Sequence, residues 1–197
     1  MRVSKEKAAE NREALLNAAG RLFRARGIDG VGVADIGREA GLTHGALYAH
    51  FDSKEALAAA AMNKGLEHSL ASMARSGGEA PDLGRYLDFL FSARMRDTLE
   101  EGCPLAASAS EVARQGEPVA ACFTEGFMRM AALVEASLDP ALPAGERRRI
   151  AFTTIAAQIG AIAATRAIAK IDPSLSDDVL ESVKSVLGQI EHGRPAR

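Results

Sequence analysis

Apolar residues recur at helical spacing along most of the chain, and short breaks rich in Gly, Pro and polar residues separate these segments. The first segment runs from residue 5 to about residue 26, and Gly27 follows it as a stop signal. Further helices are predicted over residues 33–40, 43–51, 53–73, 83–99, 103–115, 118–138, 145–170 and 175–190. The pattern therefore predicts an all-α chain of about nine helices.

Residues 33–51 form the most informative segment, because their pattern predicts two short helices joined by a tight turn. Gly41 follows the first helix at a position where a glycine can take the left-handed conformation. Thr43 stands at the N-cap of the second helix, where its hydroxyl can accept a hydrogen bond from a free backbone N–H. The segment is typical of a helix-turn-helix, although similar corners occur in all-α proteins that never bind nucleic acid.

The second helix of this pair has two different faces. Leu47 and Phe51 lie four residues apart and are expected to be buried, whereas His44 and Tyr48 share another face and are expected to point outward. A short helix with apolar anchors and an outward imidazole and phenol suits the major groove of DNA.

The start of the next helix carries a second indication. Asp52 or Ser53 caps this helix, and Glu55 can complete a capping box with Asp52. Lys54 lies in the first turn, where a positive charge opposes the helix dipole, so helix stability does not explain it. A phosphate beside the helix N-terminus would explain it.

These residues resemble the helix-turn-helix of the TetR (tetracycline repressor) family of bacterial transcriptional regulators. The resemblance covers residues 33–57 and, with the helix before them, roughly the first third of the chain. It rests on Asp35-Ile36, Ala40-Gly41-Leu42-Thr43, Gly45-Ala46-Leu47-Tyr48, His50-Phe51 and Ser53-Lys54-Glu55-Ala56-Leu57. It implies a three-helix DNA-binding domain followed by a helical domain for ligand binding and dimerisation.

The resemblance implies that double-stranded operator DNA is a partner and that six residues contact it. Thr43, Tyr48 and Lys54 suit phosphates, which position the protein without specifying a sequence, and His44 can hydrogen-bond to a base edge. The six residues are Thr43, His44, Gly45, Tyr48, His50 and Lys54.

Three positions in or near this set differ from an ordinary side-chain contact to DNA. Gly45 lets the backbone come close to the duplex, and His50 is either a DNA contact or a ring packed beside Phe51. Gly32 stands where the family often has a hydroxyl residue at the start of the first motif helix, so one phosphate contact of the family lacks its side chain here.

Composition narrows the function class. The net charge of −2 and pI of about 6.1 exclude a protein that coats DNA by charge alone, although basic residues gather before residue 33. We find no phosphate-binding glycine loop and no nucleophile elbow, and the four histidines lack metal-ligand spacing. The sequence therefore predicts a protein that is not an enzyme and has no cofactor or metal.

The sequence also bears on location. No signal peptide is recognisable, and the two cysteines do not form a disulfide framework. The longest uncharged run, between Arg149 and Arg166, is too short for a comfortable membrane span. A cytoplasmic protein without a membrane partner is expected.

The predicted domains are a helix-turn-helix domain over residues 1–53, a linking helix over 54–75 and an effector-binding and dimerisation domain over 76–197. In the helix predicted over 145–170, Ala156, Gly160 and Ala164 would let a partner helix approach closely, although one intramolecular core is the alternative. In the family, the last two helices pair with their copies in a second subunit. A homodimer also matches a palindromic operator.

The resemblance implies a small-molecule effector, expected to be largely apolar, that binds among the helices after Pro81. The residues could equally form ordinary core. The candidate residues are Phe89, Phe91, Met95, Phe123, Phe127 and Met130.

Cys103 precedes Pro104 at a predicted N-cap, where the helix dipole favours the thiolate. This placement makes Cys103 a candidate redox sensor, and a small buried apolar residue is the alternative.

Taken together, these features predict a ligand-responsive DNA-binding transcriptional regulator, a repressor that binds a palindromic operator as a dimer and is released by a small-molecule effector. The alternative is a helical protein–protein interaction module without sequence-specific DNA binding.

Overall fold

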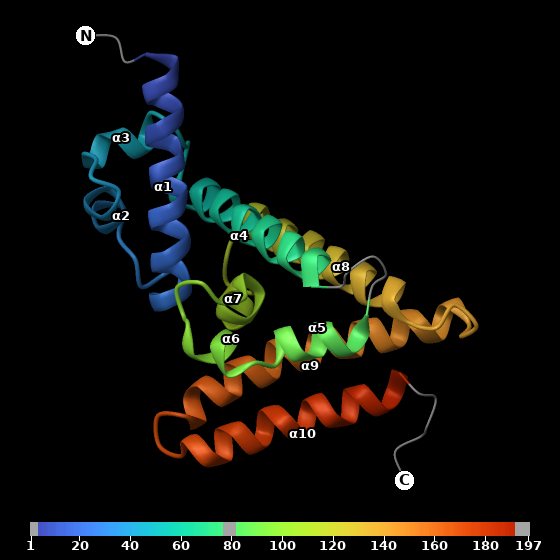
Figure 1. The fold of residues 1–197 in the computed structure, drawn as a ribbon. Helices are drawn as coiled ribbons and strands as arrows, with labels where there is room; N and C mark the ends of the chain where they lie inside the picture. Colours follow the sequence, from blue (N-terminus) through green and yellow to red (C-terminus); the bar gives the residue numbers. More distant parts are fainter. Residues whose placement is uncertain (1–3, 77–81, 192–197) are drawn as a thin grey trace. The chain divides into compact units, whose positions relative to one another are not determined.

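The computed structural model describes residues 4–76 and 82–191, and in that part of the chain every regular element is an α-helix (Figure 1). The predicted all-α fold class is confirmed. The break predicted at 76–81 lies mostly outside the described residues, and His192 lies wholly outside them. The helices are α1 (Lys5–Arg26), α2 (Val33–Glu39), α3 (His44–Tyr48), α4 (Lys54–Ser76), α5 (Leu83–Leu90), α6 (Ala93–Asp97), α7 (Pro104–Val112), α8 (Glu117–Ser137), α9 (Ala144–Ile168) and α10 (Pro173–Glu191).

The described residues contain ten helices rather than about nine, because the single helix predicted over 83–99 is two helices. The backbone of Phe91, with φ −106° and ψ 26°, leaves the helical conformation and ends α5. The Ser92 hydroxyl then accepts a hydrogen bond from the Met95 N–H at 3.2 Å and starts α6.

Contacts between the described residues divide the chain into two compact units. The first unit combines residues of the range 1–67 with residues 99–124, and the second combines 68–98 with residues of the range 125–197. The first unit therefore includes α7 in addition to the segment predicted as the DNA-binding domain.

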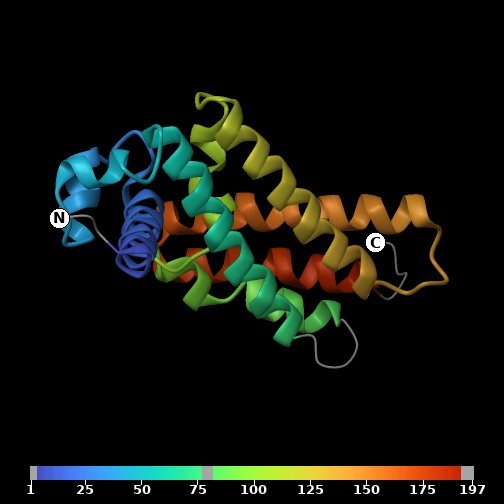
Figure 2. The same ribbon diagram turned by 90° about the horizontal axis from the view of Figure 1, so that it is seen from above.

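The first unit closes α1, α2 and α3 on one small core. The short helix α2 packs against both α1 and α3, and all three lie together in both views (Figures 1 and 2). Apolar side chains at the centre are fully removed from water, which drives this packing. The most buried of them include Leu15, Ala19, Val31, Ile36 and Leu47.

One residue of α7 and one residue that follows it form hydrogen bonds to the connection between α1 and α2. The Glu111 carboxylate accepts a hydrogen bond from the Ile28 N–H at 2.9 Å, and the Gln115 side-chain amide donates to the Asp29 carboxylate at 2.9 Å. We call Glu111 and Gln115, with these two bonds, the α7 clasp. In the segment that precedes α7, the Glu100 carbonyl accepts a hydrogen bond from the Arg24 guanidinium at 2.6 Å.

In the second unit, α9 and α10 form an antiparallel pair, seen side by side in Figures 1 and 2. By length and composition α9 could cross a membrane, but half of its apolar stretch is buried inside the protein. The buried residues Ala151, Ile155, Gln158 and Ile162 lie along one stripe, as in a core helix.

A buried arginine joins α6 to this helix pair. The Arg96 guanidinium donates to the Ser176 hydroxyl at 2.9 Å and to the Asp177 carboxylate at 2.5 Å. It also donates to Asp97, and this bond holds the pKa of the Asp97 carboxyl below its ordinary value. Ser176 in turn donates to the Thr165 carbonyl at 3.0 Å, so the buried charge has two carboxylate partners and a hydroxyl partner that is itself held in place.

Two glycines in the first unit have positive φ, and they differ in their surroundings. Gly41 has φ 68°, and a Cβ there would meet no atom within 4 Å. Gly27 has φ 78° and ψ 161°, a region that only glycine readily adopts, and a Cβ there would overlap the Glu111 carboxylate.

We expect Gly41→Ala to lower the free energy of unfolding by about 1 kcal/mol, because only the backbone preference is lost. We expect Gly27→Ala to lower it by about 3 kcal/mol, because the α7 clasp must also move. Urea unfolding of the full chain measures both values. If the two variants lost the same free energy of unfolding, the role given to the clasp would be contradicted. The same holds if Gly27→Ala lost as much in a Glu111→Ala background as in the unchanged protein.

Candidate nucleic-acid interface

The corner between α2 and α3 is built from backbone groups. The Leu42 N–H donates to the Gly37 carbonyl at 2.8 Å, and the positive φ of Gly41 lets the chain reverse direction there. A Cβ at Gly37 would lie 3.1 Å from the Leu42 carbonyl oxygen, so any larger residue would push against the backbone of this corner. The predicted left-handed glycine at position 41 is confirmed.

The start of α3 differs in one respect from the prediction. Thr43 occupies the N-cap position, with φ −74° and ψ 155°, but its hydroxyl makes no capping hydrogen bond. The predicted capping bond is therefore wrong, since the extended backbone at Thr43 starts α3 without it. The Thr43 side chain is exposed, so its hydroxyl can meet an acceptor outside the protein.

The helix α3 is shorter than predicted and spans only five residues. It ends at Tyr48, and the N–H groups of His50 and Phe51 both donate to the Leu47 carbonyl at 2.9 Å. This closing turn replaces the second helical turn that the sequence predicted, and it places Phe51 under the helix.

Burial sorts the residues of this segment as expected. Leu47 is 0% exposed and Phe51 7%, which confirms both as anchors, whereas Tyr48 is 54% exposed. Gly45 is also exposed, and a Cβ there would meet no atom within 4 Å. His50 is half-buried, and the side chain of His44 lies outside the description. The outward face thus carries small and hydrogen-bonding groups.

The N-terminus of α4 adds a positive charge to the same surface. The Ser53 hydroxyl accepts from the Ala56 N–H at 3.0 Å, so Ser53 is the cap, and the capping box predicted between Asp52 and Glu55 is wrong. The Glu55 carboxylate lies against Gly116 instead. Lys54 is the first residue of α4 and is half-buried, and no ion pair is recorded for it in the described ranges.

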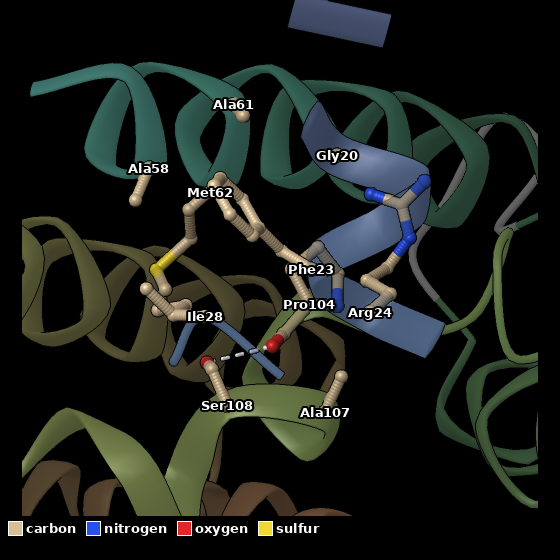
Figure 3. A pocket seen from close by; sticks show the side chains of 10 residues that line it. All are labelled: Gly20, Phe23, Arg24, Ile28, Ala58, Ala61, Met62, Pro104, Ala107 and Ser108. Carbon is tan, nitrogen blue, oxygen red and sulfur yellow. Dashed lines mark hydrogen bonds between the residues drawn. The ribbon is translucent and has the colours of Figure 1, made fainter. Parts of the chain in front are cut away.

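The first unit also contains a small pocket, lined by α1, α4 and α7 (Figure 3). Most of its lining is apolar, and the Ser108 hydroxyl donates to the Pro104 carbonyl at 2.8 Å. Arg24 lies at its edge, and burial lowers the pKa of this guanidinium. The lining residues are Gly20, Phe23, Arg24, Ile28, Ala58, Ala61, Met62, Pro104, Ala107 and Ser108.

This pocket contains none of the six residues predicted to bind an effector. Five of the six belong to the second unit, whereas Phe123 belongs to the first. The Phe127 ring packs against the Phe152 ring, with centroids 5.9 Å apart, and Met130 is 1% exposed. Phe91 is buried, and Phe89 and Met95 are half-buried. The effector assignment stays a prediction.

Cys103 occupies the N-cap position of α7, as predicted, and its side chain is 2% exposed. An oxidant would reach the thiol only after the segment before α7 opened. Redox sensing by Cys103 stays a prediction. No group of three His, Cys, Asp or Glu that could hold a metal ion is found among the described residues.

Sequence reasoning did not find two contacts that shape this surface. Arg12 lies over the ring of Phe51, and Glu111 holds the Ile28 N–H. The partners are 39 and 83 residues apart, and no pattern in a single sequence pairs them. Only the expectation that the three N-terminal helices share one core could have suggested the first contact.

Comparisons with known proteins agree with this geometry. Residues 15–61 match the family model for bacterial regulatory proteins of the tetR family. The chain is 31% identical over 155 residues to the HTH-type transcriptional regulator LmrA of Bacillus subtilis, covering 76% of this chain and 82% of that protein. It is 46% identical over 54 residues to the HTH-type transcriptional repressor BepR of Brucella suis, covering 27% of this chain and 26% of that one.

A solved structure shows the same fold over nearly the whole chain. The TetR-family transcriptional regulator from Cytophaga hutchinsonii superposes with a TM-score of 0.76 at 22% identity, covering 97% of this chain and 98% of that one. Sequence similarity, family model and fold thus agree with the exposed face of α3 and the positive start of α4. The chain belongs to the TetR family of bacterial transcriptional regulators, and it is a DNA-binding regulator rather than an enzyme.

Proposed function

We propose that this regulator is a repressor, that it binds a palindromic operator as a homodimer, and that a small-molecule effector releases it. The observation that carries the proposal is the surface formed by α3 and the start of α4. It presents Thr43, Gly45 and Tyr48 outward while Leu47 and Phe51 hold the helix in place. The relative from Brucella suis is a repressor by name, and this chain is 46% identical to it over 54 residues.

Each DNA-contacting residue has a separate role in this proposal. The exposed hydroxyls of Thr43 and Tyr48 and the ammonium group of Lys54 bind phosphates and fix the position of α3 in the major groove. Gly45, with open space around it, lets the backbone approach the duplex. His44 contacts a base edge, and His50 contributes a contact at the groove wall.

The outer face of the α9–α10 pair supports the homodimer. Ala156, Gly160 and Ala164 are all exposed on α9, so a second helix could approach this stripe closely. On α10, Leu175 is 48% exposed and Val186 is 51% exposed, so a second subunit could bury both side chains. Binding to adjacent major grooves would require the two copies of α3 to stand about one helical turn of DNA apart, at about 34 Å.

The second unit supplies a largely apolar environment for an effector. Its buried side chains are mainly apolar, and the buried polar ones are Arg96, Thr154, Gln158, Thr165 and Ser176. The Thr154 hydroxyl is buried and has no hydrogen-bond partner in the described part of the chain. This supports an effector with one hydrogen-bonding group on an apolar body. Phe89, Phe91, Met95, Phe127 and Met130 are its proposed contacts in this unit.

Release of DNA follows from a shift in populations. The effector binds more tightly to a conformation in which the two copies of α3 are wrongly spaced for adjacent major grooves, so it lowers the fraction of protein able to bind the operator. Coupling of this kind is reciprocal, because operator DNA must weaken effector binding by the same factor.

We expect Lys54→Gln to weaken binding to all DNA sequences by a similar factor, because it removes a phosphate contact. In a dimer the slope of log affinity against log salt should fall by about two. Fluorescence anisotropy with duplex DNA at several salt concentrations measures this. Lys64→Gln is the matched control, since Lys64 lies about 15 Å further along α4 and is paired with Glu13. If the salt slope of Lys64→Gln fell as much as that of Lys54→Gln, the role given to Lys54 would be contradicted.

We expect Ala164→Glu to produce monomers and to weaken operator binding by about 100-fold, because the charge would be repeated in both subunits within the stripe of exposed small residues on α9. Light scattering gives the mass, and anisotropy with the inverted repeat recovered by selection from random duplexes gives the affinity. Ala136→Glu, at an exposed position on α8, is the control and should remain dimeric. Dimers of Ala164→Glu, or selected sites without two-fold symmetry, would show the proposal to be wrong.

We expect an effector identified by thermal shift to lower operator affinity by about 5- to 150-fold at saturation. The operator should weaken effector binding by the same factor, as titration calorimetry with free and DNA-bound protein would show. Lys54→Gln should bind the effector as the unchanged protein does. Independent binding of effector and operator would exclude release by this mechanism.

A further inference from the structure

Arg12 of α1 lies over the ring of Phe51, with its guanidinium carbon 4.9 Å from the ring centroid. Phe51 follows the closing turn of α3 and precedes the Ser53 cap of α4 by two residues. Its ring is fixed in the core, since it is 7% exposed. A cation is attracted to the negative face of an aromatic ring. The contact therefore holds a positive group of α1 beside the junction of α3 and α4.

The charge on Arg12 is not neutralised by a neighbouring acid. Across residues 4–76 and 82–191 the structure records neither an ion pair nor a hydrogen bond for its guanidinium. Several other cations of the first unit are paired with carboxylates. These pairs are Lys7–Glu10, Arg21–Glu39, Arg38–Asp35 and Lys64–Glu13.

Two positive groups thus flank residues 51–54. Arg12 lies over Phe51, and Lys54 begins α4, and each lacks a recorded ion pair in the described residues. The exposed residues of α3 lie only a few positions earlier in the chain. An anion that approached this junction while α3 occupied a groove would meet the exposed guanidinium of Arg12. The anions that border a DNA groove are backbone phosphates.

We propose that Arg12 is a DNA-contacting residue that binds a backbone phosphate of the operator, and that its stack on Phe51 holds it in place before DNA binds. This inference rests on DNA binding through α3 and extends the interface to α1. The planar guanidinium matches two phosphate oxygens with parallel N–H donors. Because stacking restricts the side chain beforehand, less conformational freedom is lost on binding.

A purely structural role for Arg12 makes a different prediction. If the stack only stabilised Phe51, its loss would lower the melting temperature but leave the salt dependence of DNA binding unchanged. A phosphate contact contributes to counterion release, which appears directly in the slope of log affinity against log salt.

The test uses the full chain with two duplexes of about 30 base pairs, the inverted repeat recovered by selection and an unrelated mixed sequence. Arg12→Gln should weaken binding to both duplexes by about tenfold and lower the salt slope by about two per dimer. Arg12→Lys should keep the slope and lose part of the affinity, since charge remains and the planar stack does not. In a Phe51→Leu background, Arg12→Gln should cost less affinity than in the unchanged protein.

Arg26→Gln is the matched control. Arg26 is an exposed cation on the same helix, about 21 Å from Arg12 along the helix axis, and should leave the slope unchanged at physiological salt. A slope for Arg12→Gln equal to that of Arg26→Gln would overturn the proposal, whatever happens to the melting temperature. Circular dichroism confirms that each variant is folded. If the unchanged protein binds neither duplex, the proposed function itself fails, which is a separate outcome.

Discussion

The burial of Leu47 and Phe51 is the constraint on which the DNA-facing surface depends. The helix α3 has only five residues, so it has little stability of its own and takes its orientation from these two anchors. Their removal from water fixes the rotation of the helix and thereby decides which side chains face outward. The tight corner at Gly37 and Gly41 delivers the chain to that position.

Local signals made this region predictable from the sequence. A glycine that needs positive φ, apolar residues at helical spacing, and a threonine or serine before α3 and α4 act within a few residues of one another. These signals located α2, α3 and the start of α4, and they separated the buried face of α3 from the exposed one. The six predicted DNA-contacting residues lie in this one stretch because the same short motif carries all of them.

Competition between local signals caused the errors. Apolar residues recur at helical spacing as far as Phe91, and no Gly or Pro follows directly, so the pattern predicted one helix. The structure instead has Ser92 as the cap of a second helix. At Asp52 and Ser53 two capping residues stand side by side, and composition alone does not choose between them. The structure selects Ser53, whose hydroxyl reaches the Ala56 N–H. Thr43 shows the reverse case, since a residue with the right identity at an N-cap makes no capping bond.

Contacts between distant parts of the chain could not be predicted from a single sequence. The Arg96 cluster joins groups about 80 residues apart, and the α7 clasp joins groups more than 80 apart. The spacing of residues along one helix contains no information on such partners. The same limit applies to the predicted effector residues, because a Phe or Met at helical spacing fits a core and a binding site equally well.

The α7 clasp has a consequence for the order in which the protein forms. Because the first unit draws on residues of the range 1–67 and on residues 99–124, its N-terminal helices leave the ribosome well before their partners exist. The hydrogen-bond acceptor for Ile28 is not synthesised until Glu111. The α7 clasp can therefore form only when more than half of the chain has been made, after the three helices that it fastens.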